Sequence, residues 1–196
     1  MTGETQEEQP FVRMSKIEKK ALRRARSKES RKVKTDKYKQ NIKEKKKAMD
    51  PEIKKALAAQ KRIDQAESKL RLEESLRSGM KVCIDLSFDA EHDERDRASL
   101  VKQLSLSYSV LKSAPVPVHL HLTSLVPGSA VHTLLGTQGA ENWLVSRTEQ
   151  SAWEAFPDKS QLVVLSPDSE NIIESFDKDK VYMIGGIVDR SVRKAR

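Results

Sequence analysis

The chain has 196 residues and a formal net charge of +8, with 34% charged and 5% aromatic residues. No apolar run reaches the roughly 18 residues that a membrane span needs, and the acidic N-terminus lacks the basic and apolar regions of a secretory signal. Because the single cysteine, Cys83, cannot form an internal disulfide, we expect an intracellular protein of the nucleus, the cytoplasm or both.

The N-terminal part of the chain is strongly basic. Residues 1–79 hold 24 Lys and Arg against 13 Asp and Glu, and residues 11–62 alone hold 21 against 6. Good helix formers dominate here, Pro51 suits a first helical turn, and Gly79 suits a helix end. We therefore expect a disordered N-terminus over residues 1–10 and a basic helical arm over residues 11–79, with helices at 14–48 and 51–77.

The charge of the arm indicates a polyanionic partner, because dense Lys and Arg are typical of proteins that bind phosphate backbones. Aromatic side chains that could stack on bases are limited to Phe11 and Tyr38, so contact through charge and shape is favoured over base readout. A nuclear targeting signal and a passive solvated tail are alternative interpretations of the same residues.

From residue 80 onwards, short apolar runs alternate with helical periodicity, and the charge balance falls to 13 Lys and Arg against 16 Asp and Glu. The pattern predicts strands at 81–86, 117–123, 143–145, 161–165 and 180–184, a helix at 93–113, a short helix from 168 with Ile172, Ile173 and Phe176 inward, and mostly loop over 124–142. Strands separated by helices indicate an α/β domain with a parallel sheet over residues 80–196.

Several polar residues and glycines follow the ends of these predicted strands. Asp85 ends the first strand, Gly185 and Gly186 follow the last one, and Asp189 comes just after them. Since ligands bind outside the carboxyl ends of parallel strands, these residues could face one crevice, with Gln103 on the intervening helix. Capping, a tight turn and simple solvation are the alternative explanations for each.

The common cofactor motifs are absent. The sequence has no G-x-G-x-x-G after a strand, no Walker lysine motif and no H-E-x-x-H. His119 and His121 share a strand face without a third ligand at a suitable spacing, so packing is favoured over metal binding. Cys83, in the middle of a strand, is expected to be an inert buried thiol. We therefore expect no metal.

Three blocks of this sequence resemble the tRNA (guanine-9-N1)-methyltransferase family. They are V-C-I-D-L-S-F-D at 82–89, followed by Gln103, then L-S-P-D-S at 165–169, and V-Y-M-I-G-G-I-V-D at 181–189. The last block is the most specific, and the basic helical N-terminus is similar in character. The resemblance implies the SPOUT class, in which the C-terminal chain of a parallel sheet forms a trefoil knot that binds S-adenosylmethionine.

The resemblance also implies roles for individual residues. Asp189 would be the general base that takes the N1 proton of guanine as the methyl group arrives, and Asp85 and Gln103 match positions implicated in activity. The cofactor-binding residues would be Leu165, Gly185, Gly186, Asp189, Arg190, Ser191, Val192 and Arg193. The methyl donor is an activated sulfonium, so the reaction needs no metal. The implied partner is tRNA, bound through the basic arm by a monomer with no membrane contact.

Family members usually continue past the I-G-G-I-V-D block, so we expect the knot to be incomplete in this chain. Two functions therefore stay open: a methyltransferase, and a catalytically inactive RNA-binding protein of the same ancestry. Titration with S-adenosylmethionine distinguishes them, since only a closed pocket binds the cofactor measurably. A nucleotide-binding protein unrelated to methylation is a third alternative, and it would need a phosphate-binding loop that the sequence lacks.

Overall fold

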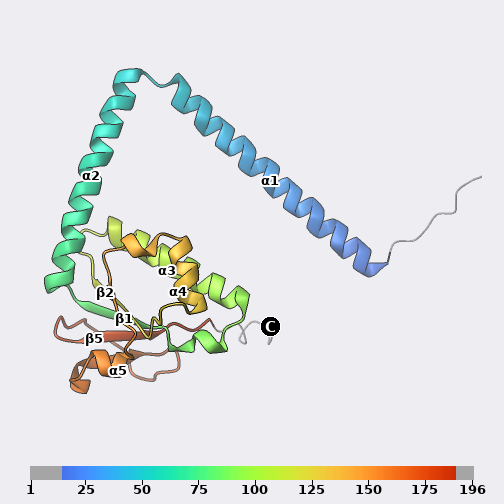
Figure 1. Ribbon diagram of the computed structural model, residues 1–196. Coiled ribbons are helices and arrows are strands. Elements are labelled where there is room, and N and C mark those ends of the chain that lie inside the picture. The colour runs from blue at the N-terminus through green and yellow to red at the C-terminus, as the bar shows by residue number, and fades with distance from the viewer. Residues whose placement is uncertain (1–14, 189–196) are drawn as a thin grey trace, which may run out of the picture. The chain divides into compact units, whose positions relative to one another are not determined.

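The computed structural model describes residues 15–188 (Figure 1). The chain forms two compact units that meet between Gln60 and Lys61. The second unit therefore includes most of the helix that follows Pro51. No helix within residues 15–188 is long and apolar enough to cross a membrane.

The first unit consists of helix α1 (Lys16–Ala48) and the first turns of helix α2 (Pro51–Ser78). Ser15 and Glu18 begin α1 with a capping box, in which the Ser15 hydroxyl accepts from the Glu18 amide and the Glu18 carboxylate accepts from the Ser15 amide. No residue of α1 is buried. With 16 Lys and Arg against 4 Asp and Glu, α1 is a basic helix exposed on every side.

The second unit is built on a five-stranded sheet in which every neighbouring pair is parallel. The strand order is β3-β2-β1-β5-β4. The strands are β1 (Lys81–Asp85), β2 (His119–Thr123), β3 (Ser146–Arg147), β4 (Leu162–Leu165) and β5 (Val181–Gly185). The predicted α/β class with a parallel sheet is confirmed, and the knot stays a prediction.

Helices cover both faces of the sheet (Figure 1). Helices α3 (Glu94–Ser113) and α4 (Ala130–Thr137) lie on one face, and the short helix α5 (Ala152–Ala155) lies on the other. Three 3-10 turns, η1 (Ser87–Glu91), η2 (Ala140–Asn142) and η3 (Lys159–Gln161), complete the elements of this unit. The larger core packs α3 and α4 against β1 and β2, and it includes Leu72 from the second half of α2.

Helix α3 forms as its periodicity predicts. The Asp93 side chain accepts from the Asp96 amide and caps the first turn. The predicted inward residues are buried in the core, namely Leu100, Val101, Leu104 and Tyr108. The apolar face of this helix is therefore what joins it to the sheet.

Two local predictions were wrong because of contacts between distant residues. Helix α4 replaces much of the loop expected over 124–142, and the Asp89 carboxylate accepts its Val131 amide at 3.2 Å. The strand expected at 143–145 lies instead at 146–147. Tyr108 accounts for that shift, since its hydroxyl accepts the Leu144 amide at 3.0 Å and its ring stacks on Trp143.

The helix expected from residue 168 does not form, and Ile172 and Phe176 are 88% and 65% exposed rather than inward. Side chains in this segment bond to nearby amides: Ser166 accepts from Asp168, and Ser169 accepts from Asn171. Such local side-chain bonds compete with helical ones and favour turns.

Candidate functional site

The carboxyl ends of three neighbouring strands bring predicted site residues together. Asp85 ends β1 and pairs in register with Gly185 at the end of β5. Leu165 ends β4 and pairs with Ile184 of β5. These positions are far apart in the sequence, yet they lie together at the carboxyl ends of the strands, where parallel sheets bind ligands. We call this end of the sheet the Asp85 edge.

The carboxylate of Asp85 is held by hydroxyl groups from two loops. Ser124 donates to Asp85 Oδ1 at 2.7 Å, and Ser87 donates to Oδ2 at 2.9 Å. Ser124 has a φ of 55°, a backbone conformation that few residues other than glycine adopt. This strained residue follows β2 directly, so it fixes the direction of the neighbouring strand's carboxylate. No motif in the sequence indicated its role.

The two glycines after β5 have different surroundings. The Gly186 amide donates to the Asp85 carbonyl at 2.7 Å. A Cβ atom on Gly186 would lie 2.7 Å from that carbonyl oxygen and 2.9 Å from Leu86 Cδ2, so only glycine fits. A Cβ on Gly185 would meet nothing closer than Phe88 Cε2 at 3.5 Å. Gly186 therefore serves the packing of β5 on β1, whereas a Cβ on Gly185 would make only ordinary contacts.

An apolar surface lies next to these glycines. Leu165 and Ile184 share one face of the sheet because they are paired on adjacent strands. Ile184 is 41% exposed and Ile187 is 50% exposed. Asp85 pairs with Gly185, one residue further along β5 than Ile184, so its side chain lies on the other face of the sheet.

Other predicted site residues are not joined to this edge. Gln103 is exposed on α3, and its side-chain amide donates to the Ser99 hydroxyl at 3.4 Å. It shares no hydrogen bond with Asp85 within residues 15–188. The five remaining positions lie outside the described residues: Asp189, Arg190, Ser191, Val192 and Arg193.

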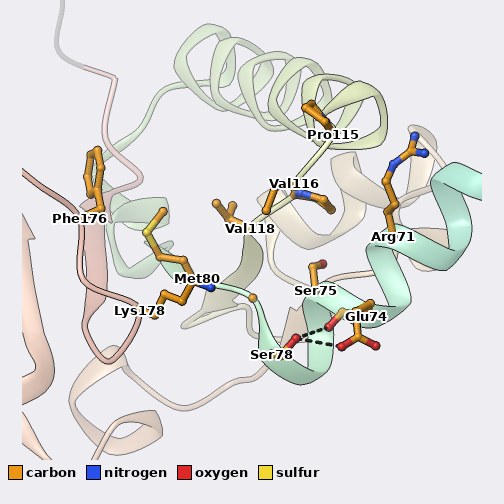
Figure 2. Close-up of a pocket in the computed structure, with 12 residues that line it drawn as sticks. Arg71, Glu74, Ser75, Ser78, Met80, Pro115, Val116, Val118, Phe176 and Lys178 are labelled. Carbon is orange, nitrogen blue, oxygen red and sulfur yellow. Dashed lines mark hydrogen bonds between the residues drawn. The ribbon is translucent and has the colours of Figure 1, made fainter.

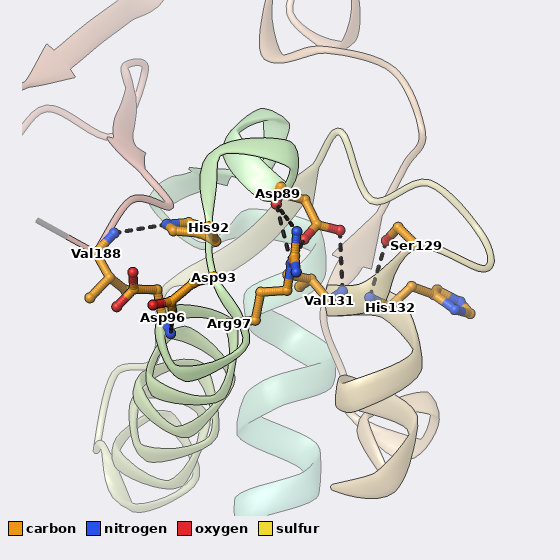
Figure 3. Close-up of polar contacts among 9 residues, drawn as sticks. All are labelled: Asp89, His92, Asp93, Asp96, Arg97, Ser129, Val131, His132 and Val188. Atoms are coloured by element: carbon orange, nitrogen blue, oxygen red, sulfur yellow. Dashed lines mark hydrogen bonds and ion pairs between the residues drawn. The ribbon is translucent and has the colours of Figure 1, made fainter.

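A partly buried ion pair that the sequence did not predict anchors the loop after Asp85 (Figure 3). Arg97 Nε of α3 donates to Asp89 Oδ1 at 2.7 Å, and the Val131 amide of α4 donates to Asp89 Oδ2. Burial opposes ionisation, but the bonds from Arg97 and Val131 outweigh it and hold the pKa of Asp89 below its usual value. Asp89 belongs to the V-C-I-D-L-S-F-D block, which was the only signal for it.

His119, His121 and Cys83 pack on the face of the sheet that α5 covers, opposite α3 and α4. The rings of His119 and His121 lie 3.9 Å apart, and His119 Nε2 is 2.8 Å from the Ser146 hydroxyl. Burial, together with the charges of His119 and Lys81, lowers the pKa of His121 to about 4. Burial likewise raises the pKa of the Cys83 thiol, which is fully buried as expected for an inert residue.

Within residues 15–188, no group of three His, Cys, Asp or Glu side chains is arranged to hold a metal ion. An apolar cavity of about 440 Å³ lies at the other end of the strands (Figure 2). It is lined by Met80 before β1, Val118 before β2 and Phe176 before β5. Because these residues precede their strands, the cavity is separate from the Asp85 edge.

Residues 14–196 match the family model described as tRNA (guanine(9)-N(1))-methyltransferase TRM10/TRM10A. The chain is 35% identical over 128 residues to tRNA methyltransferase 10 homolog B of Bos taurus, covering 64% of this chain and 40% of that protein. It is 31% identical over 196 residues to the tRNA (guanine(9)-N1)-methyltransferase of Schizosaccharomyces pombe, covering 96% of this chain and 61% of that protein. The chain thus spans about 40–60% of the length of these curated relatives.

Two solved structures share the fold. One is the full-length spTrm10 complex with SAH, at 33% identity and a TM-score of 0.53, covering 57% of this chain and 63% of that one. The other is spTrm10(74), at 30% identity and a TM-score of 0.54, covering 61% of this chain and 66% of that one.

Proposed function

Since the chain belongs to the tRNA (guanine(9)-N(1))-methyltransferase family, we propose that it transfers a methyl group from S-adenosylmethionine to N1 of guanine 9 in tRNA. The observation that carries the proposal is the pairing of β1 with β5, which brings Asp85 beside Gly185 and Gly186. The chain leads from these glycines to Asp189 through only Ile187 and Val188. Asp85 is thus the predicted catalytic carboxylate within the described residues, and Asp189 follows them in the sequence.

Leu165, Ile184 and Gly185 would hold the cofactor. S-adenosylmethionine supplies an electrophilic methyl group on a sulfonium, and SAH, found in the spTrm10 complex, is what remains after that group is transferred. The exposed apolar surface of Ile184 supports this assignment. Most of the remaining barrier is the alignment of donor and acceptor, which a rigid sheet edge favours.

Asp189 acts as the general base in this proposal. Guanine N1 carries a proton that must leave as the methyl group arrives, and a carboxylate within hydrogen-bond reach can take it. Ser87 and Ser124 hold the Asp85 carboxylate through one oxygen each. Each oxygen can accept a further hydrogen bond, so Asp85 is suited to accept one from the substrate in a fixed direction.

The basic helix α1 binds tRNA in this proposal. Its 16 basic residues face solvent throughout, and they end in the run Lys45, Lys46 and Lys47. Exchanging these three lysines for glutamine should weaken tRNA binding and make it less sensitive to salt, because fewer counterions are released. Exchange for arginine is the matched control, since it keeps the charge, and tRNA affinity should hardly change.

The Asp189→Asn variant tests the catalytic assignment. Asparagine has nearly the same shape but cannot take the N1 proton, so single-turnover methyl transfer should slow by about 10²–10⁴-fold with unchanged tRNA affinity. An unchanged rate removes Asp189 from the mechanism. An unsubstituted chain that binds tRNA but neither binds S-adenosylmethionine nor methylates is instead the inactive RNA-binding protein, whose arm needs no closed cofactor pocket.

A further inference from the structure

A buried histidine contacts the backbone directly before Asp189 (Figure 3). His92 lies between η1 and α3 and is only 6% exposed. Its Nε2 accepts a hydrogen bond from the Val188 amide at 3.0 Å, and this bond joins segments 96 residues apart. Val188 is covalently followed by Asp189, the proposed general base.

The contact defines the state of the imidazole ring. A nitrogen that accepts the Val188 amide must carry a lone pair, so the ring is neutral with its proton on Nδ1. Nδ1 is buried and has no hydrogen-bond partner within residues 15–188. An apolar side chain would fill the same space without burying an unsatisfied donor. The presence of histidine here is therefore explained by its acceptor nitrogen rather than by packing alone.

The backbone around His92 is well anchored. The His92 amide donates to the Asp89 carbonyl at 3.3 Å, and Arg97 Nε donates to the Asp89 carboxylate at 2.7 Å. The next residue, Asp93, caps the first turn of α3. These bonds hold the imidazole on the same loop that follows Asp85 in β1.

We propose that His92 is a positioning residue that, by accepting the Val188 amide, holds the backbone after β5 against the loop that follows Asp85. The inference rests on the proposed role of Asp189. His92 itself does not touch the reacting atoms in this account. It acts through the backbone, and it links the end of β5 to the loop after β1.

Two variants separate the acceptor from the bulk of the ring. His92→Phe keeps a planar ring but removes the acceptor, and His92→Gln offers an amide oxygen at a similar reach. Hydrogen exchange of the Val188 amide in the full chain should be at least about 10-fold faster in His92→Phe and restored in His92→Gln. The amide of Met183, inside β5, is the control and should exchange at an unchanged rate in both variants.

Methyl transfer provides the second measurement. Single-turnover methylation of tRNA should fall by about 10- to 100-fold in His92→Phe, with unchanged tRNA affinity, and recover in His92→Gln. Unchanged Val188 exchange in His92→Phe, or faster exchange with an unchanged methylation rate, overturns the inference. Absence of methylation by the unsubstituted chain contradicts the proposed function instead, and the exchange rates then still decide whether His92 holds Val188.

Discussion

Replacing Gly186 by alanine tests how tightly β5 approaches β1. The new Cβ would lie 2.7 Å from the Asp85 carbonyl oxygen, and ordinary contact begins at 3.4 Å, so the backbones must separate by about 0.7 Å. The same movement would stretch the Gly186–Asp85 hydrogen bond from 2.7 Å to about 3.4 Å, beyond the usual range. Overpacking costs about 1–3 kcal/mol and the weakened bond about 1 kcal/mol more.

Gly185→Ala is the matched control, because its Cβ would be in ordinary contact with Phe88 and Ile187. Urea denaturation should show a loss of about 2–4 kcal/mol for Gly186→Ala and less than about 1 kcal/mol for Gly185→Ala. In thermal unfolding, the Gly186 variant should melt roughly 4–16 °C lower. Two variants with equal free energies of unfolding would refute the close approach of the strands as the reason for Gly186.

Three further outcomes are expected. Leu72→Ala should lower the free energy of unfolding by about 2–5 kcal/mol, because this α2 side chain is 3% exposed in the core. Leu70→Ala, at a 65% exposed site, should lower it by less than about 0.5 kcal/mol in the same denaturation assay. Deleting residues 1–60 should remove most tRNA affinity in a binding titration without lowering the melting temperature, since Leu72 stays in place. Between pH 6.5 and about 4, the unfolded chain protonates His121 and the folded chain does not, so the melting temperature should fall as pH falls, and this slope should flatten in His121→Leu.

The sequence was sufficient to predict elements whose stability is local. Helix α1 has its own capping box and strong helix formers, and α3 has an apolar face that repeats with helical periodicity. The strands with continuous apolar runs, β1 and β4, were also predicted close to their observed bounds. The register between β1 and β5, which brings Asp85 and Gly185 together, came from the structure.

Features that depend on distant residues could not be predicted. Helix α4 begins where Asp89 accepts the Val131 amide, and no pattern within 124–142 reveals that contact. Leu72 of α2 packs into the core, so the second compact unit begins at Lys61, within the basic arm that composition defines. The hydroxyl of Ser124 and the imidazole of His92 likewise gain their roles only from the folding of separate loops onto one edge.

The most direct test of the account is site-resolved methylation of tRNA. The full chain would be incubated with labelled S-adenosylmethionine and a tRNA transcript, and the labelled nucleotide would be mapped. The account predicts label at N1 of guanine 9, its absence from a transcript with another base at that position, and a loss of about 10²–10⁴-fold in rate for Asp189→Asn. Bound tRNA without any transfer of label, or label at guanine 9 at an equal rate in Asp189→Asn, would contradict it.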